Sequence, residues 1–466
     1  MRSHLVKAAA LGLLLAASAP AAFAASKAFV FQSDYSTGSL SAHDVAPRTA
    51  HCDVASVNSD ASMRWYDGRL YVVNRLGGDN VQVIDPATNA TVKQFSVGNG
   101  SNPHDIAFAS PTHAYVTRFD DTDLWIVNPV SGAHTGTIHL AGFADADGNP
   151  EMDRMMMVGP LLFVSLERID RNNGYGPADT ALVAVIDTRA DTLVDCNPAR
   201  PGVQAIPLQL RNPFTAFQYD PVARRLLIGC VGFFGALDGG IERIDPFALA
   251  SGGVAITESA LGGDVSDVVW GDAGKSWAIA ADAGGNTRFM TWSATTGAVL
   301  NTLWNPGGYV LSDAELNNAG EVWVCNNSFS TPRVRVFSAA TDATLGSDVL
   351  CTLPAVSVTF DAQTGAATGV APAATTLSFA PPAPSPAHAT VRLDWSLAER
   401  ANVQLVVFDP AGRRVRALVD VARAAGPGSV AWDLADDAGR RVAPGLYLVR
   451  LRAGGDAMTR RVIVTR

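Results

Sequence analysis

One strand-and-turn pattern recurs along this chain, and it limits the available folds more than any other feature. In each copy a short apolar strand ends in Asp, Asn or Ser, and a tight turn follows at once. Successive copies are spaced by roughly 43 to 59 residues. Six clear copies end at Asp85, Asn128, Asp187, Asp245, Ser293 and Ser338, and a weaker copy, Gly38–Ser41, precedes them. The sequence therefore contains seven related units.

Each unit also contains two earlier strands. An apolar, aromatic-rich strand precedes the recurring one, as Tyr71–Asn74 and Trp277–Ala280 do, and another short strand with a tight turn comes before it, as at Asp105–Phe108. Four strands in about 45 residues are typical of one β-propeller blade. Leucine-rich repeats have a shorter period, and helical repeats show a spacing of about 3.6 residues. The pattern predicts an all-β chain whose main domain is a seven-bladed β-propeller.

The two ends of the repeat region complement each other. The first copy lacks an innermost strand, because Phe29–Phe31 already matches the second strand of the other copies. The missing strand is present at the far end, in Val356–Asp361. We expect this segment to complete the first blade and close the ring, because a closed ring leaves no bare sheet edge.

Several copies resemble a known repeat family. Tyr71–Asn74 with Asp79–Asp85, then Tyr115–Arg118, and the Asn102–Ala107 approach to an inner strand resemble the YVTN-type propeller repeats of bacterial surface and periplasmic proteins. The resemblance covers about residues 27 to 361. It implies the fold and leaves the function open, because such propellers serve many roles.

The N-terminus predicts export. Arg2 and Lys7 supply positive charge before the short apolar stretch Ala8–Ala19, and Ala22-Phe23-Ala24 is a small-x-small cleavage pattern. We expect residues 1–24 to be a signal peptide and the protein to be secreted, at the cell surface or in the periplasm. No later segment has the roughly 18 apolar residues of a membrane helix, so no transmembrane segment is expected.

The chain changes character after the repeats. Residues 362–389 are rich in Ala, Thr and Pro, which favours an extended linker between the propeller of residues 25–361 and a second domain. Residues 390–466 contain about seven short strands with alternating patterning, such as Val403–Phe408 and Gly445–Leu451. They predict a small immunoglobulin-like β-sandwich.

This second domain also resembles known modules. Val430–Asp433, Asp437–Arg440 and Ala443–Tyr447 resemble the Ig-like domain of the flagellar hook-capping protein and the C-terminal sorting domains of the type IX secretion route. The resemblance implies either a structural module or an export and surface-attachment tag. Contact with secretion machinery or with the cell surface is expected through this domain.

Charge is divided unevenly along the chain. The net charge of −9 separates into +5 from Ser385 onward and −14 before it. An acidic propeller repels phosphate backbones, so we expect no nucleic-acid partner.

The cysteines do not form a recognisable motif. Their number is odd, and their spacing matches neither a redox nor a haem-attachment pattern. We expect buried thiols that pack as small apolar groups, with one disulfide as the alternative. The five are Cys52, Cys196, Cys230, Cys325 and Cys351.

Propeller topology indicates which face carries a site. The connections from the second to the third strand, and from the fourth to the next first strand, emerge on one face, which we call the loop face. There the loops are long and unlike one another, at 143–157, 168–180 and 231–240, whereas the opposite turns are short and capped by Asp85, Asn128 and Asp245. Variable loops on a rigid ring favour binding at the loop face.

Residues that enter the innermost strands surround the central channel on this face. The candidate ligand-binding residues are Arg64, His104, Asp105, Arg154, Asp267 and Asp313. The three aspartates have an alternative role as hydrogen-bond acceptors for backbone groups between blades. A His beside carboxylates suits acid–base chemistry, so His104, Glu151 and Asp153 are the candidate catalytic residues.

One loop has the composition of a cation site. Oxygen-bearing side chains alternate along Asp145–Asp153, and such side chains can surround Ca²⁺. The candidate ligands are Asp145, Asp147, Asn149, Glu151 and Asp153. Pro150 and Met156 exclude a helix-loop-helix calcium site, and a polar turn satisfied by its own backbone is the alternative. The methionines Met155–Met157 indicate inner-strand packing.

Two classes of function are compatible with these features. The first is a secreted or surface recognition protein that binds an extracytoplasmic protein, a glycan or a small ligand. The second is a propeller enzyme of the lactone hydrolase or lyase type, and an accessory subunit of an extracytoplasmic redox complex is a further alternative. The absence of GxSxG, HExxH and GxxxxGK[ST] patterns favours the first class.

Overall fold

The computed structural model describes residues 26–178, 180–361, 377–380, 382, 386–397, 401–410, 412–423, 426–453 and 456–465. Strands dominate these residues, and the single α-helix among them, α1 (Glu258–Leu261), is one turn long. The expected signal peptide lies outside the described residues. No helix in the described ranges has the length and apolarity that crossing a membrane requires.

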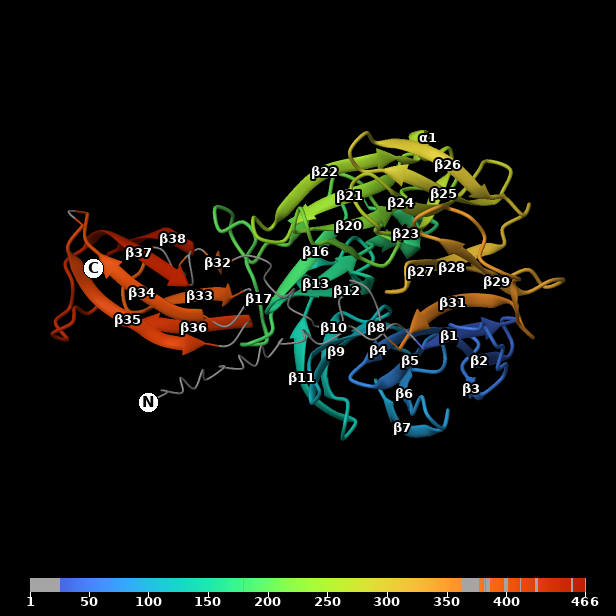
Figure 1. The fold of residues 1–466 in the computed structure, drawn as a ribbon, viewed down its shortest axis with the longest axis horizontal. Coiled ribbons are helices and arrows are strands. Elements are labelled where there is room, and N and C mark those ends of the chain that lie inside the picture. The colour runs from blue at the N-terminus through green and yellow to red at the C-terminus, as the bar shows by residue number, and fades with distance from the viewer. Residues whose placement is uncertain are drawn as a thin grey trace, which may run out of the picture.

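Seven antiparallel sheets follow one another in chain order around a ring, as Figure 1 shows. Blades 2 and 3, each from the inner to the outer strand, are β4 (Ala61–Tyr66), β5 (Arg69–Asn74), β6 (Asn80–Ile84) and β7 (Thr91–Ser96), then β8 (Pro103–Ser110), β9 (His113–Arg118), β10 (Asp123–Asn128) and β11 (Ala133–His139). Blade 4 is β12 (Met152–Val158), β13 (Leu161–Leu166) and β16 (Leu182–Asp187), with β17 (Thr192–Leu193) and β18 (Ile206–Pro207) on its outer side.

The remaining blades repeat the order. Blade 5 is β19 (Gln218–Asp220), β20 (Arg225–Cys230), β21 (Gly240–Asp245) and β22 (Ala250–Thr257), and blade 6 is β23 (Asp264–Val269), β24 (Ser276–Ala281), β25 (Thr287–Ser293) and β26 (Ala298–Trp304). Blade 7 is β27 (Leu311–Leu316), β28 (Glu321–Asn326), β29 (Arg333–Ser338) and β30 (Val349–Leu350). The predicted seven-bladed propeller is confirmed.

Blade 1 combines the two ends of the repeat region. Its strands are β31 (Ala355–Phe360), β1 (Lys27–Ser33), β2 (Gly38–Asp44) and β3 (Ala55–Val57), so its inner strand comes from the far end of the chain. β31 pairs antiparallel with β1, and Val30 lies opposite Val358. The ring is therefore closed by the segment that the sequence indicated.

The core lies between neighbouring blades. Tyr115 and Leu124 of blade 3 pack with Met155, Met157 and Leu162 of blade 4, and all five are buried. Burial of each large apolar side chain contributes about 1.5–3 kcal/mol. The methionines of β12 therefore have the packing role expected of them.

The face opposite the loops is built from short turns. The side-chain oxygens of Asp85, Asn128 and Asp245 each accept hydrogen bonds from backbone N–H groups two or three residues further on. These residues cap their turns as predicted, which leaves the long connections to the loop face.

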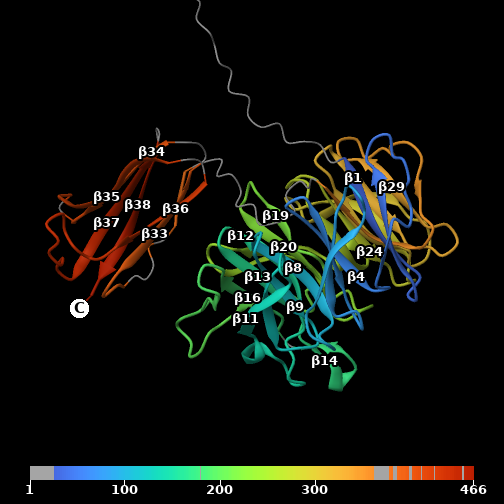
Figure 2. The same cartoon turned by 90° about the horizontal axis from the view of Figure 1, so that it is seen from below.

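The C-terminal domain is a two-sheet sandwich, drawn in red and orange in Figures 1 and 2. One sheet is β32 (Ser378–Phe379), β33 (Val391–Leu397) and β36 (Gly426–Trp432). The other is β35 (Arg414–Arg423), β34 (Ala401–Phe408), β37 (Gly445–Ala453) and β38 (Asp456–Val464).

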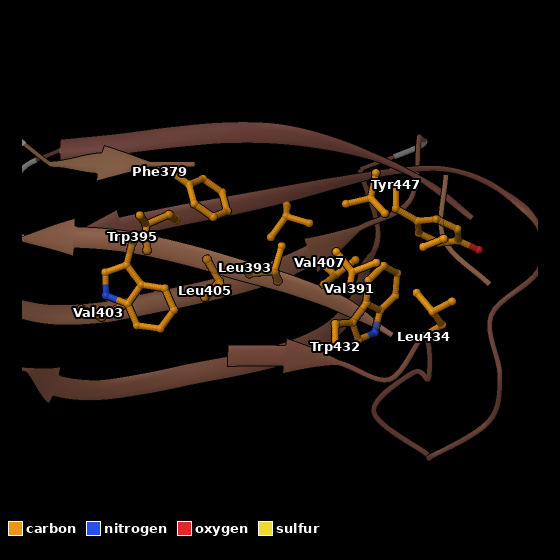
Figure 3. Packing of buried hydrophobic residues seen from close by; sticks show 14 of the residues in the cluster. Phe379, Val391, Leu393, Trp395, Val403, Leu405, Val407, Trp432, Leu434 and Tyr447 are labelled. Carbon is orange, nitrogen blue, oxygen red and sulfur yellow. The ribbon is translucent and has the colours of Figure 1, made fainter. Parts of the chain in front are cut away.

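The sandwich has its own core, shown in Figure 3. Trp432 is completely buried and packs edge-on against Tyr447, with ring centroids 5.5 Å apart. Its indole N–H donates to the carbonyl of Ala435 at 2.9 Å, so the buried polar group is satisfied. The core begins earlier than expected, because Phe379 belongs to it although it lies in the stretch assigned to the linker.

The cysteines are unpaired. All five lie in the described part of the chain, none is in a disulfide, and Cys230 and Cys325 are buried. Burial raises the pKa of both thiols well above the usual range, so they remain protonated and pack as apolar groups.

Candidate functional site

The inner strands present their polar residues through a repeated irregularity. The pairing of β8 with β9 shifts register between Pro103 and Ile106, and that of β12 with β13 shifts between Met152 and Met155. Similar shifts occur near the start of β23 and β27. A bulge alters the direction of the side chains within it. His104, Asp105, Asp153 and Arg154 all lie at such positions.

Three of the predicted ligand-binding residues join blades together. Asp105 accepts a hydrogen bond from the backbone N–H of Met155, Asp267 from that of Ala314, and Asp313 from that of Val358, each at 2.8 Å. Each donor belongs to the following blade. These contacts support the alternative interpretation, in which the aspartates accept backbone hydrogen bonds between blades.

His104 has both ring nitrogens engaged. Nδ1 lies 2.7 Å from Asp153 Oδ1, Nε2 lies 2.8 Å from an Arg75 terminal nitrogen, and the ring stacks on Phe119 with centroids 4.1 Å apart. Burial, together with the charge of Arg75, lowers the pKa of His104 to about 4. The neutral ring therefore donates to Asp153 and accepts from Arg75, which leaves no nitrogen for proton transfer to a substrate.

The three candidate catalytic residues do not share the same contacts. His104 and Asp153 do meet, but Glu151 makes its contacts with Ile169 and Arg171 instead. Glu151 precedes the bulge of β12 and takes part in the loop before it, whereas Asp153 lies within the bulge.

Arg154 lies beside Asp153, and its guanidinium group makes no side-chain hydrogen bond to a described residue. Its Nε is 3.3 Å from Asp153 Oδ1 without forming a hydrogen bond, although that nitrogen is buried. Its terminal guanidinium nitrogens have no hydrogen-bond partner among the described residues, and the side chain remains 24% exposed. The charges of Arg64 and Arg75 act electrostatically on Arg154. Their side chains are exposed to a similar extent, 26% and 24%. A partly open guanidinium with unused N–H groups suits an oxyanion.

Several buried acids near these arginines are held toward their neutral form. Burial and the neighbouring Asp153 raise the pKa of Glu167 well above the usual range, and burial with Asp313 does the same for Asp267 and Glu315. Burial raises the pKa of Asp313 to about 6. In their protonated form Glu167, Asp267 and Glu315 do not neutralise the arginines, so these three carboxyls compete little with an anionic ligand.

Sequence reasoning missed Arg75, Glu167 and Glu315. Arg75 and Glu167 each directly follow the second strand of a blade, β5 or β13, where the chain reaches the loop face. A charged residue at that repeated position was a usable signal. Glu315 lies inside β27 with the apolar residues of an inner strand, and no local pattern distinguishes it.

The predicted cation ligands are brought together in part. Oxygens of Asp145, Asp147 and Glu151 all lie within 4.8 Å of one another. Asn149 lies in the same loop, and its side-chain amide donates to the carbonyl of Phe119. Asp153 is excluded from the ligand set, because its carboxylate contacts His104 and Arg154.

The loop face also carries exposed aromatic side chains. They come from five loops on this face, between β1 and β2, β13 and β16, β20 and β21, β26 and β27, and β28 and β29. Their exposures range from 42% to 73%. They are Tyr35, Tyr175, Phe233, Phe234, Tyr309 and Phe329. Exposed aromatic groups are typical of surfaces that bind partners.

A cavity of about 330 Å³ lies at the other face, between the turns of blades 5 and 6. Its acidic lining residues Asp220 and Asp272 accept hydrogen bonds from the backbone of their own turns. Because these carboxylates already accept backbone hydrogen bonds, we regard the residues around His104 and Arg154 as the better candidate site.

Comparison with known families identifies the second domain. Residues 385–456 match the family described as the FlgD Ig-like domain. This agrees with the two-sheet sandwich and with the hook-capping resemblance. No curated protein matches the sequence.

Solved structures match this chain at low sequence identity. PorZ, a surface component of the type IX secretion system of Porphyromonas gingivalis, is 14% identical, with 93% of this chain and 64% of PorZ covered and a TM-score of 0.42. This chain thus spans less than two thirds of the length of PorZ.

Two further structures cover the chain less completely. A functionally unknown protein from Desulfotomaculum acetoxidans is 10% identical, with 72% and 99% of the two chains covered and a TM-score of 0.48. Hydrazine synthase from Kuenenia stuttgartiensis is 14% identical, with 65% and 90% covered and a TM-score of 0.45. At these values no function transfers to this chain.

Proposed function

We propose that this chain is an exported recognition protein whose propeller binds an oxyanion-bearing ligand at the mouth of its central channel. The observation that carries the proposal is the Arg154 guanidinium, which is partly open and has terminal nitrogens that no described residue hydrogen-bonds. Holding such a group in a mostly buried position is costly unless a partner satisfies it. A bound carboxylate, sulfate or phosphate would supply that partner.

The neighbouring residues support an anion rather than a cation. Arg64 and Arg75 add positive charge, whereas His104 is neutral and the pKa of Glu167 is raised. Arg64 is already paired with Asp105, so it adds positive electrostatic potential but does not offer its paired N–H groups to a ligand. Arg154 is the residue with donors to offer.

The exposed aromatic residues of the loop face favour a ligand that is larger than a free anion. Aromatic rings pack against the apolar faces of sugars, and guanidinium groups bind the carboxylates of acidic sugars. An acidic saccharide would use both features of the loop face, whereas a small free anion would use Arg154 alone.

Calorimetric titration tests this proposal. The probes are inorganic sulfate and phosphate, galacturonate, an oligogalacturonide, and a neutral oligosaccharide of equal length. We expect the oligogalacturonide to bind, and we expect Arg154→Gln to weaken it at least about tenfold, since a charge-assisted bond contributes roughly 1.5–3 kcal/mol. Arg69→Gln, which changes an arginine next to the opposite turns, is the matched control.

Each outcome has a defined meaning. Binding of sulfate or galacturonate with the affinity of the oligosaccharide would favour a small-anion site. Unchanged binding in Arg154→Gln, equal binding of the neutral oligosaccharide, or no binding of any acidic probe would overturn the proposal.

We propose further that the propeller is a member of the YVTN-type repeat family and that the C-terminal sandwich serves export, surface attachment or spacing. The sandwich has a separate core and carries strongly exposed arginines, among them Arg413 and Arg440 at 81% and 80% side-chain exposure. Cell fractionation tests this role by comparing the full chain with one that ends at Asp361. We expect the shorter chain in the medium or the periplasm and the full chain at the cell surface. An identical distribution would contradict an attachment role.

A further inference from the structure

The connection between blades 3 and 4 is folded around a set of inward-facing oxygens. In this loop every second residue from Asp145 to Glu151 carries a side-chain oxygen. The backbone is compact, because the N–H of Gly148 donates to the carbonyl of Asp145 and Gly148 has a φ of 90°. The fold of the loop brings oxygens of Asp145, Asp147 and Glu151 within 4.8 Å of one another, and Asn149 lies between them in the sequence.

Some of these oxygens are used by the loop itself. Asp145 Oδ1 accepts from the N–H of Asp147, and Asp147 Oδ1 accepts from that of Asn149. Glu151 Oε2 accepts from the N–H of Ile169 in the next long loop. These bonds fix the orientation of each carboxylate.

Three other oxygens of the loop have no hydrogen-bond donor in the described part of the chain. Asp145 Oδ2, Asn149 Oδ1 and Glu151 Oε1 are buried and have no hydrogen-bond partner among the described residues. Glu151 as a whole is 0% exposed. A buried carboxylate oxygen without a donor costs free energy, and native proteins almost always satisfy such atoms. The loop therefore contains three buried oxygens that no described hydrogen-bond donor satisfies.

The positive charge of Arg171 is divided between Glu151 of this loop and Asp120. Its Nε lies 3.3 Å from Glu151 Oε1 without forming a hydrogen bond, while its terminal nitrogen pairs with Asp120 at 2.6 Å. One guanidinium shared between Asp120 and Glu151 leaves Asp145 Oδ2 and Asn149 Oδ1 without a donor among the residues that the structure describes.

The arrangement matches the coordination of a hard divalent cation. Calcium takes oxygen ligands at about 2.3–2.6 Å, so oxygens across its shell lie up to about 5 Å apart. The oxygens of Asp145, Asp147 and Glu151 fall within 4.8 Å of one another. Mg²⁺ requires a smaller octahedral shell at about 2.0–2.1 Å.

We propose that this loop is a calcium site with ligands from Asp145, Asp147, Asn149 and Glu151. The ion would connect the blade 3–4 connection to the loop of residues 167–181, because Glu151 and Asp147 also bond the backbone N–H groups of Ile169 and Arg171. The site is independent of the oxyanion site at Arg154, and its role is to order two long loops of the loop face.

Calcium binding to the full chain tests the site. Protein stripped with EGTA is titrated calorimetrically with CaCl₂ and separately with MgCl₂, and its melting temperature is measured with and without about 5 mM Ca²⁺, a level that saturates even weak extracellular sites. We expect one Ca²⁺ per chain, weaker Mg²⁺ binding, and a rise in melting temperature of several degrees.

Variants identify the ligands. Glu151→Gln preserves an oxygen for the Ile169 N–H but removes the charge, and we expect at least a tenfold loss of Ca²⁺ affinity. Asp145→Asn is a second variant in a less buried position, and Asp272→Asn, in a turn on the opposite face, is the control. No heat and no thermal shift in stripped protein would overturn the site. So would unchanged binding in both variants, while equal Mg²⁺ affinity would overturn its assignment to calcium.

Discussion

The guanidinium of Arg64 holds the carboxylate of Asp105 through two hydrogen bonds, Nε to Oδ1 at 2.7 Å and a terminal nitrogen to Oδ2 at 2.6 Å. The two residues lie on the inner strands of neighbouring blades. Asp105 also accepts from the backbone N–H groups of Ile106 and Met155, so a single buried carboxylate links blades 2, 3 and 4. Two-point pairing of this kind is strong and directional.

Replacement of Asp105 should therefore lower the free energy of unfolding strongly, whereas replacement of Asp267, its counterpart in blade 6, should lower it little. Asp105→Asn leaves Arg64 without its anion, and loss of one partner of a buried ion pair costs about 3–5 kcal/mol. Burial raises the pKa of Asp267 well above the usual range, and Asp267 accepts from Ala314, a bond that an Asn oxygen can keep. Asp267→Asn should cost no more than about 1 kcal/mol. Urea unfolding of both variants checks the contrast, and equal losses would refute it.

His43 should make stability depend on pH. It is completely buried in β2, its Nε2 has no hydrogen-bond partner among the described residues, and burial with the charge of His51 lowers its pKa to about 4. The unfolded chain takes up this proton near pH 6.5 and the folded chain only near pH 4. The contribution of His43 is therefore present above pH 6.5 and is lost as the pH falls toward 4, by up to about 3 kcal/mol.

A difference measurement isolates this effect, because raised carboxyl pKa values such as that of Asp313 change stability in the opposite direction. Unfolding free energies are compared at pH 7.5 and pH 5 for the native chain, His43→Gln and the exposed-site control His139→Gln. The native chain and the control should lose more stability on acidification than His43→Gln does. Parallel losses in all three would contradict the assignment.

The ring should fail when its closing strand is removed. A chain that ends at Pro354 lacks β31, which exposes the edge of β1 and the buried side chains of Phe29 and Phe31. A chain that ends at Asp361 keeps β31 and is the matched control. We expect a lower melting temperature and self-association only in the shorter chain, because unpaired apolar edges bind one another. Light scattering after size-exclusion chromatography measures this, and a stable monomer ending at Pro354 would disprove closure by β31.

The fold was readable from the sequence because its determinants are local and repeated. Turn caps such as Asp85 and the missing inner strand near Phe29 are visible without any knowledge of distant contacts. The end of the linker was not, because Phe379 joins the sandwich by pairing Ser378–Phe379 with Ser396 and Trp395, a pairing that no local pattern specifies.

The site was readable only in outline. Position on an inner strand predicts that His104 and Arg154 lie near the channel, but it does not say which partners satisfy them. Burial and the charge of Arg75, which follows β5, keep His104 neutral. Asp153 contacts His104 instead of the cation loop, because it lies in the bulge of β12. Both outcomes depend on contacts between segments far apart in the chain.

The two domains should unfold separately. The core of the sandwich contains only residues from 377 onward, and the described ion pair that links it to the propeller, Arg189 with Asp394, is long at 3.4 Å and exposed. Trp432→Ala removes a completely buried indole and should cost about 3–5 kcal/mol within the sandwich alone. Calorimetry of Trp432→Ala should show the sandwich unfolding at a lower temperature and the propeller unfolding at an unchanged temperature. The control Arg413→Ala, at a side chain that is 81% exposed, should change neither transition. A common shift of both transitions would show that the domains unfold as one unit.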